Sequence, residues 1–77
     1  MLNNGVPSRA QLETLRSRYP KGTRVELVHT SDPYTKLQPG TKGTVEFVDD
    51  AGTIQISWDN GSGLGMIPGE DEVRKLQ

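Results

Sequence analysis

The residues GTVEFVDDAGTIQISWDNGSGLGMI, at positions 43–67, contain three short runs in which apolar and polar side chains alternate. A period of two places the apolar members of each run on one face of a strand. The turn formers Asp50-Ala51-Gly52 and Asn60-Gly61 separate the runs, and Asn-Gly suits a tight primed hairpin turn because both residues tolerate a positive φ. The stretch therefore predicts a three-stranded antiparallel meander with one apolar face. That face is expected to contain Val45, Phe47, Ile54, Ile56, Trp58, Leu64 and Met66.

Two further runs flank this meander. Thr23–His29 is predicted to be a first strand, with Val25 and Leu27 on its apolar face. Val73–Leu76 is predicted to be a short last strand that pairs with the first one. Closing a small, strongly bent sheet removes most of its exposed edges. The sequence therefore predicts a mostly β fold, a five-stranded SH3-like small barrel with an N-terminal helix.

The predicted helix covers residues 8–19. Ser8 can cap it, and Gln11 stands at the spacing of a capping box. Pro20 ends it, because the residue before a proline is disfavoured in the α region. Its apolar stripe consists of Leu12, Leu15 and Tyr19. We expect this stripe to pack on the barrel, and binding of a partner by the helix is the alternative.

A length of 77 residues predicts one domain with a small core and no deep catalytic cavity. We divide it into a disordered lead (1–7), the helix (8–19) and the barrel (20–77). The absence of cysteine excludes disulfides and thiolate metal sites. The N-terminus lacks the apolar segment of a signal peptide, and no apolar run approaches the ~20 residues of a membrane span. We therefore expect a soluble, cytoplasmic protein that does not associate with membranes.

Charge is distributed unevenly, although the formal net charge is only −1. Residues 1–24 carry five basic side chains against Glu13 alone, whereas residues 46–72 carry seven acidic ones and no Lys or Arg. One interpretation is a solvated basic helix and solvated acidic turns. The other is a basic N-terminal segment that contacts an acidic or phosphate-bearing partner.

No motif for catalysis, a cofactor or a metal emerges from the chain. His29 has no second histidine or cysteine with which to share a metal. Gly40–Thr44 lacks the distal glycine of a phosphate loop, and no helix follows the glycine-rich stretch Gly61–Gly65. The aspartates of the predicted turns do not form a calcium-loop pattern. We expect a protein that is not an enzyme and has no cofactor, no metal site and no catalytic residues.

The candidate binding region is the polar loop Thr30–Thr41, which is longer than a hairpin requires. Asp32-Pro33 favours the start of a turn, and Pro39-Gly40 suits the centre of a type II turn. One interpretation places Leu37 under the loop with Tyr34 covering it. In the other, Tyr34 and Lys36 bind a partner, as loop residues often do. We expect the loop to lie beside the acidic turn, which makes Tyr34, Lys36, Asp49, Asp50 and Arg24 the candidate binding residues.

A series of short motifs also follows in order along residues 19–76. These are Gly22, Arg24–Leu27, Asp32–Leu37, Pro39-Gly40, Gly43–Val45, Val48–Gly52, Trp58–Ser62 and Ile67–Gly69. In this order they resemble a small domain of unknown function found mostly in phages, prophages and other mobile elements of bacteria. The resemblance leaves the N-terminal helix outside, and it implies an SH3-like barrel without implying an activity.

Three functional hypotheses follow. The leading one is a non-catalytic binding module of phage or mobile-element origin that recognises a protein partner through the long loop and the adjacent strand faces. The second is an anti-defence protein that inhibits a host immune enzyme or sequesters its nucleotide signal. The third is a nucleic-acid-binding small barrel, which is weakened because the barrel is acidic and has no basic stripe.

Overall fold

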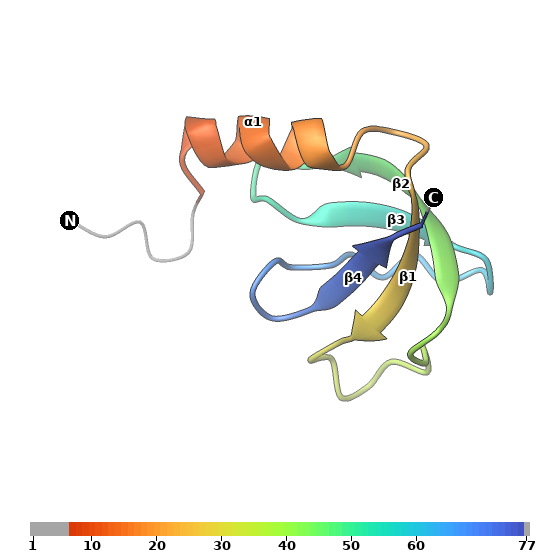
Figure 1. The fold of residues 1–77 in the computed structure, drawn as a ribbon. Coiled ribbons are helices and arrows are strands. Elements are labelled where there is room, and N and C mark those ends of the chain that lie inside the picture. Colours follow the sequence, from red (N-terminus) through yellow and green to blue (C-terminus); the bar gives the residue numbers. More distant parts are fainter. Residues whose placement is uncertain (1–6, 77) are drawn as a thin grey trace.

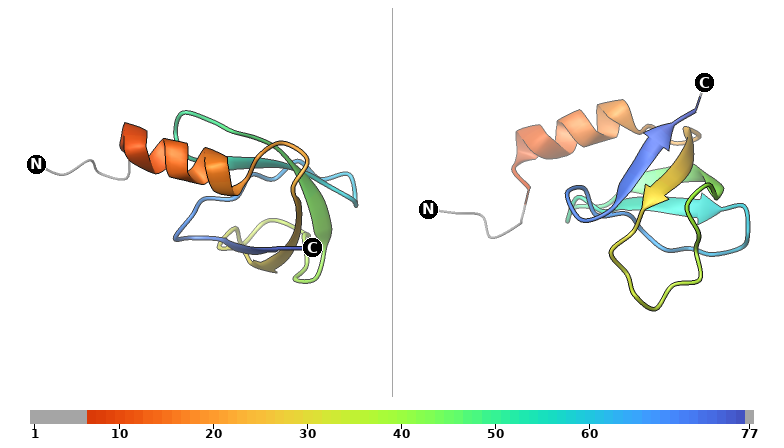
Figure 2. Two further views of the ribbon diagram at one scale, coloured as in Figure 1. Left: turned by 45° about the horizontal axis from the view of Figure 1, so that its top comes forward. Right: turned by 60° about the horizontal axis from the view of Figure 1, so that its bottom comes forward.

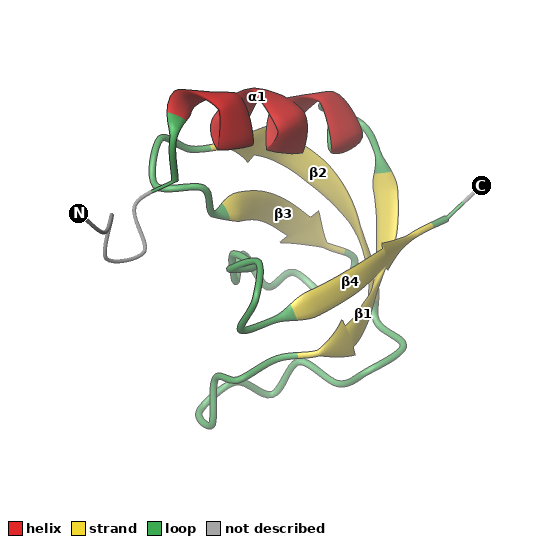
Figure 3. Ribbon diagram, turned by 60° about the vertical axis from the view of Figure 1, so that its left-hand side comes forward, coloured by secondary structure: helices red, strands yellow, loops and turns green. Residues whose placement is uncertain are grey.

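The computed structural model describes residues 7–76, which form one helix and one four-stranded antiparallel sheet (Figure 1). The elements are α1 (Arg9–Arg18), β1 (Arg24–His29), β2 (Lys42–Val48), β3 (Ile54–Trp58) and β4 (Glu72–Lys75). The strands are ordered β3-β2-β1-β4, and β4 pairs with β1 as predicted. The sheet is strongly curved, and α1 lies against it next to β2 (Figures 2 and 3). The predicted disordered lead falls outside the described residues except for Pro7.

A capping box begins α1, and the apolar stripe of the helix docks it on the core. The Ser8 hydroxyl accepts a hydrogen bond from the Gln11 N–H at 3.1 Å, and the Ser8 N–H donates to the Gln11 side-chain oxygen at 2.7 Å, which completes the predicted capping box. Leu12, Leu15 and Tyr19 all pack against the core. Arg16 reinforces this docking, because its guanidinium donates two hydrogen bonds to the carbonyl of Val48 at 3.0 and 3.1 Å. The apolar stripe of the helix therefore belongs to the domain's own packing.

The core lies inside the curve of the sheet. Its buried side chains are Val25, Leu27, Leu37, Val45, Val48, Ile54, Ile56, Trp58 and Met66. Trp58 is 2% exposed, and its indole N–H donates to the carbonyl of Leu64 at 2.8 Å. A buried indole N–H requires such a partner. Trp58 is therefore a core residue, as the alternation of β3 predicts.

The third run of the meander does not form a strand. Within residues 7–76, Met66 makes only an isolated bridge to Ile54, through two backbone hydrogen bonds of 2.8 and 2.9 Å. Glycine weakens strands, and this segment carries Gly61, Gly63 and Gly65. The prediction of a fifth strand here is therefore wrong for the described residues, and the sheet is open between its edge strands β3 and β4.

Phe47 is the second departure from the predicted alternation. A β-bulge shifts the register between Val45, which pairs with Ile56, and Phe47, which pairs with Gln55. The extra residue moves Phe47 off the core face, where it is 55% exposed, and Val48 is buried in its place. Strict alternation cannot anticipate a bulge, because a bulge changes the face of every residue after it.

The hairpin turn after β3 has the predicted glycine but a different geometry. Gly61 takes a φ of +92°, as predicted. Its N–H donates to the carbonyl of Trp58 at 2.9 Å, and the Trp58 N–H donates to the carbonyl of Ser62 at 3.0 Å. The loop therefore spans three residues, with Asp59-Asn60 at the centre of the turn and Gly61 in the bulge position. The turn after β2 has the same pattern, with Gly52 in place of Gly61.

Candidate functional site

The long loop Thr30–Thr41 is fixed at several points along its backbone. The Asp32 carboxylate accepts from the Tyr34 N–H at 2.9 Å, and the Thr35 hydroxyl accepts from the Leu37 N–H at 3.1 Å. Leu37 is 4% exposed and anchors the middle of the loop in the core. Pro39-Gly40 forms the predicted type II turn, whose Thr41 N–H donates to the carbonyl of Gln38 at 3.1 Å. The loop is therefore ordered by its own side chains.

Tyr34 projects from this ordered loop into solvent. It is 91% exposed, so it does not cover Leu37 as one interpretation of the sequence had it. Lys36 is exposed on the same loop, and no carboxylate of the described residues forms an ion pair with it. A large amphipathic ring and a cation without an ion-pair partner in residues 7–76 thus stand on one short, fixed segment.

Asp71 ties the start of this loop to the segment before β4. Its Oδ1 accepts from the Thr30 hydroxyl at 2.9 Å and from the Ser31 N–H at 2.8 Å, and its Oδ2 accepts from the Ile67 N–H at 2.8 Å. Burial acts to raise the pKa of Asp71, but these hydrogen bonds outweigh it and hold the pKa below its ordinary value. The sequence interpretation placed Asp71 in a simple turn, since no local pattern indicates partners forty residues away.

The acidic turn lies away from the loop. Loop 30–41 precedes β2 whereas Asp49-Asp50 follows it, so the two lie at opposite ends of that strand (Figures 1 and 2). Asp50 forms an ion pair with Arg16 of α1 at 2.9 Å. Asp49 accepts from the Thr53 N–H within its own turn at 2.9 Å, which is the main reason that its pKa is lowered. The predicted groove between Tyr34 and these carboxylates is therefore not formed.

Arg24 is the fifth predicted binding residue, and it is also at the far end of its strand from the loop. Its guanidinium donates to both carboxylate oxygens of Asp59 at 2.8 and 2.7 Å, and to the Thr44 hydroxyl at 2.9 Å. The hydrogen bond to Asp59 is the main reason that the pKa of Arg24 is raised. The five predicted residues therefore lie in three separate places: Tyr34 and Lys36 in the loop, Asp49 and Asp50 in the turn after β2, and Arg24 at the start of β1.

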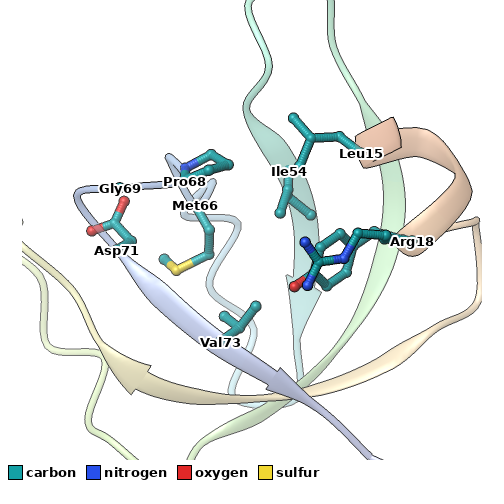
Figure 4. Close-up of a pocket in the computed structure, with 9 residues that line it drawn as sticks. Leu15, Arg18, Ile54, Met66, Pro68, Gly69, Asp71 and Val73 are labelled. Carbon is teal, nitrogen blue, oxygen red and sulfur yellow. The ribbon is translucent and has the colours of Figure 1, made fainter. Parts of the chain in front are cut away.

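A pocket that the sequence interpretation missed lies in the gap between β4 and α1 (Figure 4). Its volume is about 190 Å³. Its lining residues are Leu15, Arg18, Tyr19, Ile54, Met66, Pro68, Gly69, Asp71 and Val73. Most of them are apolar, while Arg18 and Asp71 stand at opposite ends of the view in Figure 4. The apolar stripe of the helix pointed to this region, but periodicity alone could not distinguish a filled contact from one that leaves a cavity.

Two cations flank the ring of Tyr19 at one end of this pocket. The guanidinium carbon of Arg18 and the Lys75 ammonium each lie 5.7 Å from the ring centroid. That distance is within the range of cation–π attraction. Neither cation forms an ion pair with a described carboxylate, in contrast to Arg9, Arg16, Arg24 and Arg74. This end of the pocket is therefore electropositive.

No group of three or more His, Cys, Asp or Glu side chains in residues 7–76 is arranged to hold a metal ion. In the same range, α1 is neither long nor apolar enough to cross a membrane.

A family model described as "Domain of unknown function (DUF4314)" matches residues 8–76. The chain belongs to this DUF4314 family. Because the match begins at Ser8, α1 is part of the DUF4314 domain, whereas the motif resemblance left the helix outside. The packing of Leu12 and Leu15 on the core agrees with this wider boundary. No curated protein and no solved structure matches the chain.

Proposed function

We propose that this DUF4314 domain is a non-catalytic binding module that recognises a protein partner through loop 30–41, with Tyr34 as the anchor. The observation that carries the proposal is a tyrosine that is 91% exposed on a loop held by side-chain hydrogen bonds and a buried leucine. Tyrosine is enriched among the residues that dominate binding energy at interfaces. A loop that is ordered before binding loses less conformational entropy when the partner docks.

The charges near Tyr34 support a protein partner over nucleic acid. Lys36 is the exposed cation on the loop, and a single cation does not supply the basic stripe that binding to phosphate backbones requires. Elsewhere in residues 7–76, every arginine except Arg18 is already paired with a carboxylate. An interface with Tyr34 at its centre and Lys36 at its rim fits a protein surface that carries an apolar pocket and a nearby carboxylate.

The proposal includes two further expectations from the sequence, an SH3-like barrel and an origin in phages or mobile elements. We take the open sheet to be a reduced SH3-like barrel, in which the segment around Met66 occupies the place of the missing strand. The two hydrogen bonds between Ile54 and Met66 support that assignment. The motif resemblance supports an origin in phages or mobile elements, so the partner would be a protein of the phage or of its bacterial host. Inhibition of a host immune enzyme is one form that such binding could take.

Site-specific crosslinking in the cells that produce the protein tests the proposal. A photoreactive phenylalanine analogue replaces Tyr34 in one variant and Phe47 in the control variant, since Phe47 is an exposed aromatic residue on a different surface. The partner crosslinked at Tyr34 is identified by mass spectrometry, and its affinity is then measured for wild-type protein, Tyr34→Ala and Phe47→Ala. We expect Tyr34→Ala to weaken binding at least tenfold and Phe47→Ala to leave it unchanged. Equal crosslinking at both positions, or unchanged affinity of Tyr34→Ala, would refute the proposal.

A further inference from the structure

We propose that the gap between β4 and α1 is a second binding site, which takes an extended acidic peptide as an added strand on β4. The site does not include Tyr34 or Lys36. Within residues 7–76 it combines three features: a free strand edge, an apolar pocket beside that edge, and two unpaired cations at one end of the pocket.

The free edge belongs to β4, which pairs with β1 alone among the described strands. The Leu76 N–H donates to the carbonyl of Arg24 at 2.9 Å, which fixes the phase of the ladder. Backbone groups of an antiparallel strand point alternately to its two sides. The N–H and C=O groups of Arg74 therefore face β1, where Arg74 pairs with Glu26, and those of Val73 and Lys75 face outward. An extended peptide can hydrogen-bond to such an edge.

The pocket supplies an anchor next to this edge. Val73 lines it from β4, Leu15 from α1, and Tyr19 from the position that caps the C-terminal end of α1. Its volume of about 190 Å³ is smaller than the roughly 300–1,000 Å³ of typical small-molecule sites. It therefore suits one apolar side chain of a peptide better than a whole ligand. Main-chain bonds along β4 would provide affinity, and this pocket would select the side chain.

The charged side chains around the pocket indicate that the peptide is acidic. Arg18 and Lys75 stand beside Tyr19, and neither has a carboxylate partner in residues 7–76. The carboxylate of Asp71 at the other end is occupied by donors from its own chain and would repel a ligand carboxylate. The peptide is therefore oriented, with its apolar side chain in the pocket and its Asp or Glu side chain against Arg18 and Lys75.

A selection from a random library of displayed twelve-residue peptides tests this proposal with the intact chain as bait. We expect the enriched peptides to carry Asp or Glu within two residues of a large apolar residue. A synthetic peptide from that pool should bind Arg18→Glu at least tenfold more weakly than wild-type protein. Arg9→Glu is the matched control, because Arg9 is exposed at the other end of the same helix. Its affinity should equal that of the wild type.

Backbone amides provide the readout that distinguishes strand addition from simple charge attraction. On peptide binding, the amide protons of Val73 and Lys75 should exchange more slowly with solvent, whereas that of Arg74 is already in the ladder. Tyr34→Ala should bind the peptide normally, so failure of the Tyr34 proposal and failure of this one are separable. The proposal is overturned if no peptide is enriched, if enriched peptides are basic, if Arg18→Glu binds normally, or if the two outward amides do not respond. A dimer in light scattering whose interface protects β4 would also overturn it, since a second copy would then be the occupant.

Discussion

Replacement of Asp71 by asparagine tests how the candidate binding loop is held. The carboxylate accepts hydrogen bonds from Thr30, Ser31 and Ile67, at donor–acceptor distances of 2.8–2.9 Å for the shortest from each. An asparagine can keep its carbonyl oxygen toward the first two donors. Its amide nitrogen then faces the Ile67 N–H, so that one backbone donor loses its acceptor.

The magnitude follows from these contacts. Hydrogen bonds to a charged acceptor are stronger than those to a neutral one, but the Ile67 N–H lies at the surface, where water can replace part of the lost bond. We expect Asp71→Asn to lower the free energy of unfolding by about 1 kcal/mol at pH 7. For a domain of this size that corresponds to a fall in Tm of roughly 4–8 °C. Urea denaturation followed by tryptophan fluorescence measures the change, because Trp58 is buried in the core.

The pH dependence of the same variant checks the electrostatic part. The folded-state pKa of Asp71 is lower than its unfolded value, so its contribution to stability is complete above the ordinary carboxyl range. That contribution is lost as the pH falls through the folded pKa. The difference in the free energy of unfolding between wild type and Asp71→Asn should therefore become smaller as the pH is lowered from 7 to about 3. Glu70→Gln is the control. Glu70 is exposed, so its replacement should leave the free energy of unfolding unchanged. A wild-type stability for Asp71→Asn at pH 7, or a difference that is independent of pH, would contradict this account.

Three further predictions concern packing and exposure. Trp58→Ala should cost about 3–5 kcal/mol and leave little folded protein, which circular dichroism would show; a normal melting curve would contradict the core assignment. Gly43→Ala should cost about 1–3 kcal/mol, because an added Cβ would lie 2.7 Å from the Ile56 side chain and 2.8 Å from the Trp58 ring. Gly63→Ala is its control and should melt normally, since nothing lies within 4 Å of its added Cβ. Tyr34→Ala should change stability by no more than about 0.5 kcal/mol, and a larger loss would place the ring in the core.

Features that depend on a few adjacent residues could be predicted from the sequence. The capping box needs only Ser8 and Gln11, and the type II turn needs only Pro39-Gly40, so each was predicted at the correct place. The pairing of the last strand with the first was also predicted correctly. It follows from burying the apolar faces of both strands around one small core.

Features that depend on distant residues or on register could not be predicted. The bulge in β2 exposes Phe47, although its place in the alternation matches that of a buried residue. The glycines before Met66 leave an isolated bridge where alternation predicted a strand. Tyr34 and Lys36 share the loop by their place in the sequence, whereas the predicted proximity of Arg24 to them is wrong, because Arg24 is paired with Asp59 instead. These contacts join residues that lie far apart in the sequence, so a local sequence pattern does not indicate them.

The position of β1 at the centre of the sheet has a consequence for how the chain folds. The β2–β3 hairpin pairs Val48 with Ile54, so its contacts are local and form early. The other edge of β1 pairs Val25 with Lys75, and this contact closes a loop that contains most of the domain. An intermediate in which β4 has not yet docked would therefore leave one edge of β1 unsatisfied. An unpaired strand edge is prone to mispairing, and formation of the β1–β4 ladder removes it.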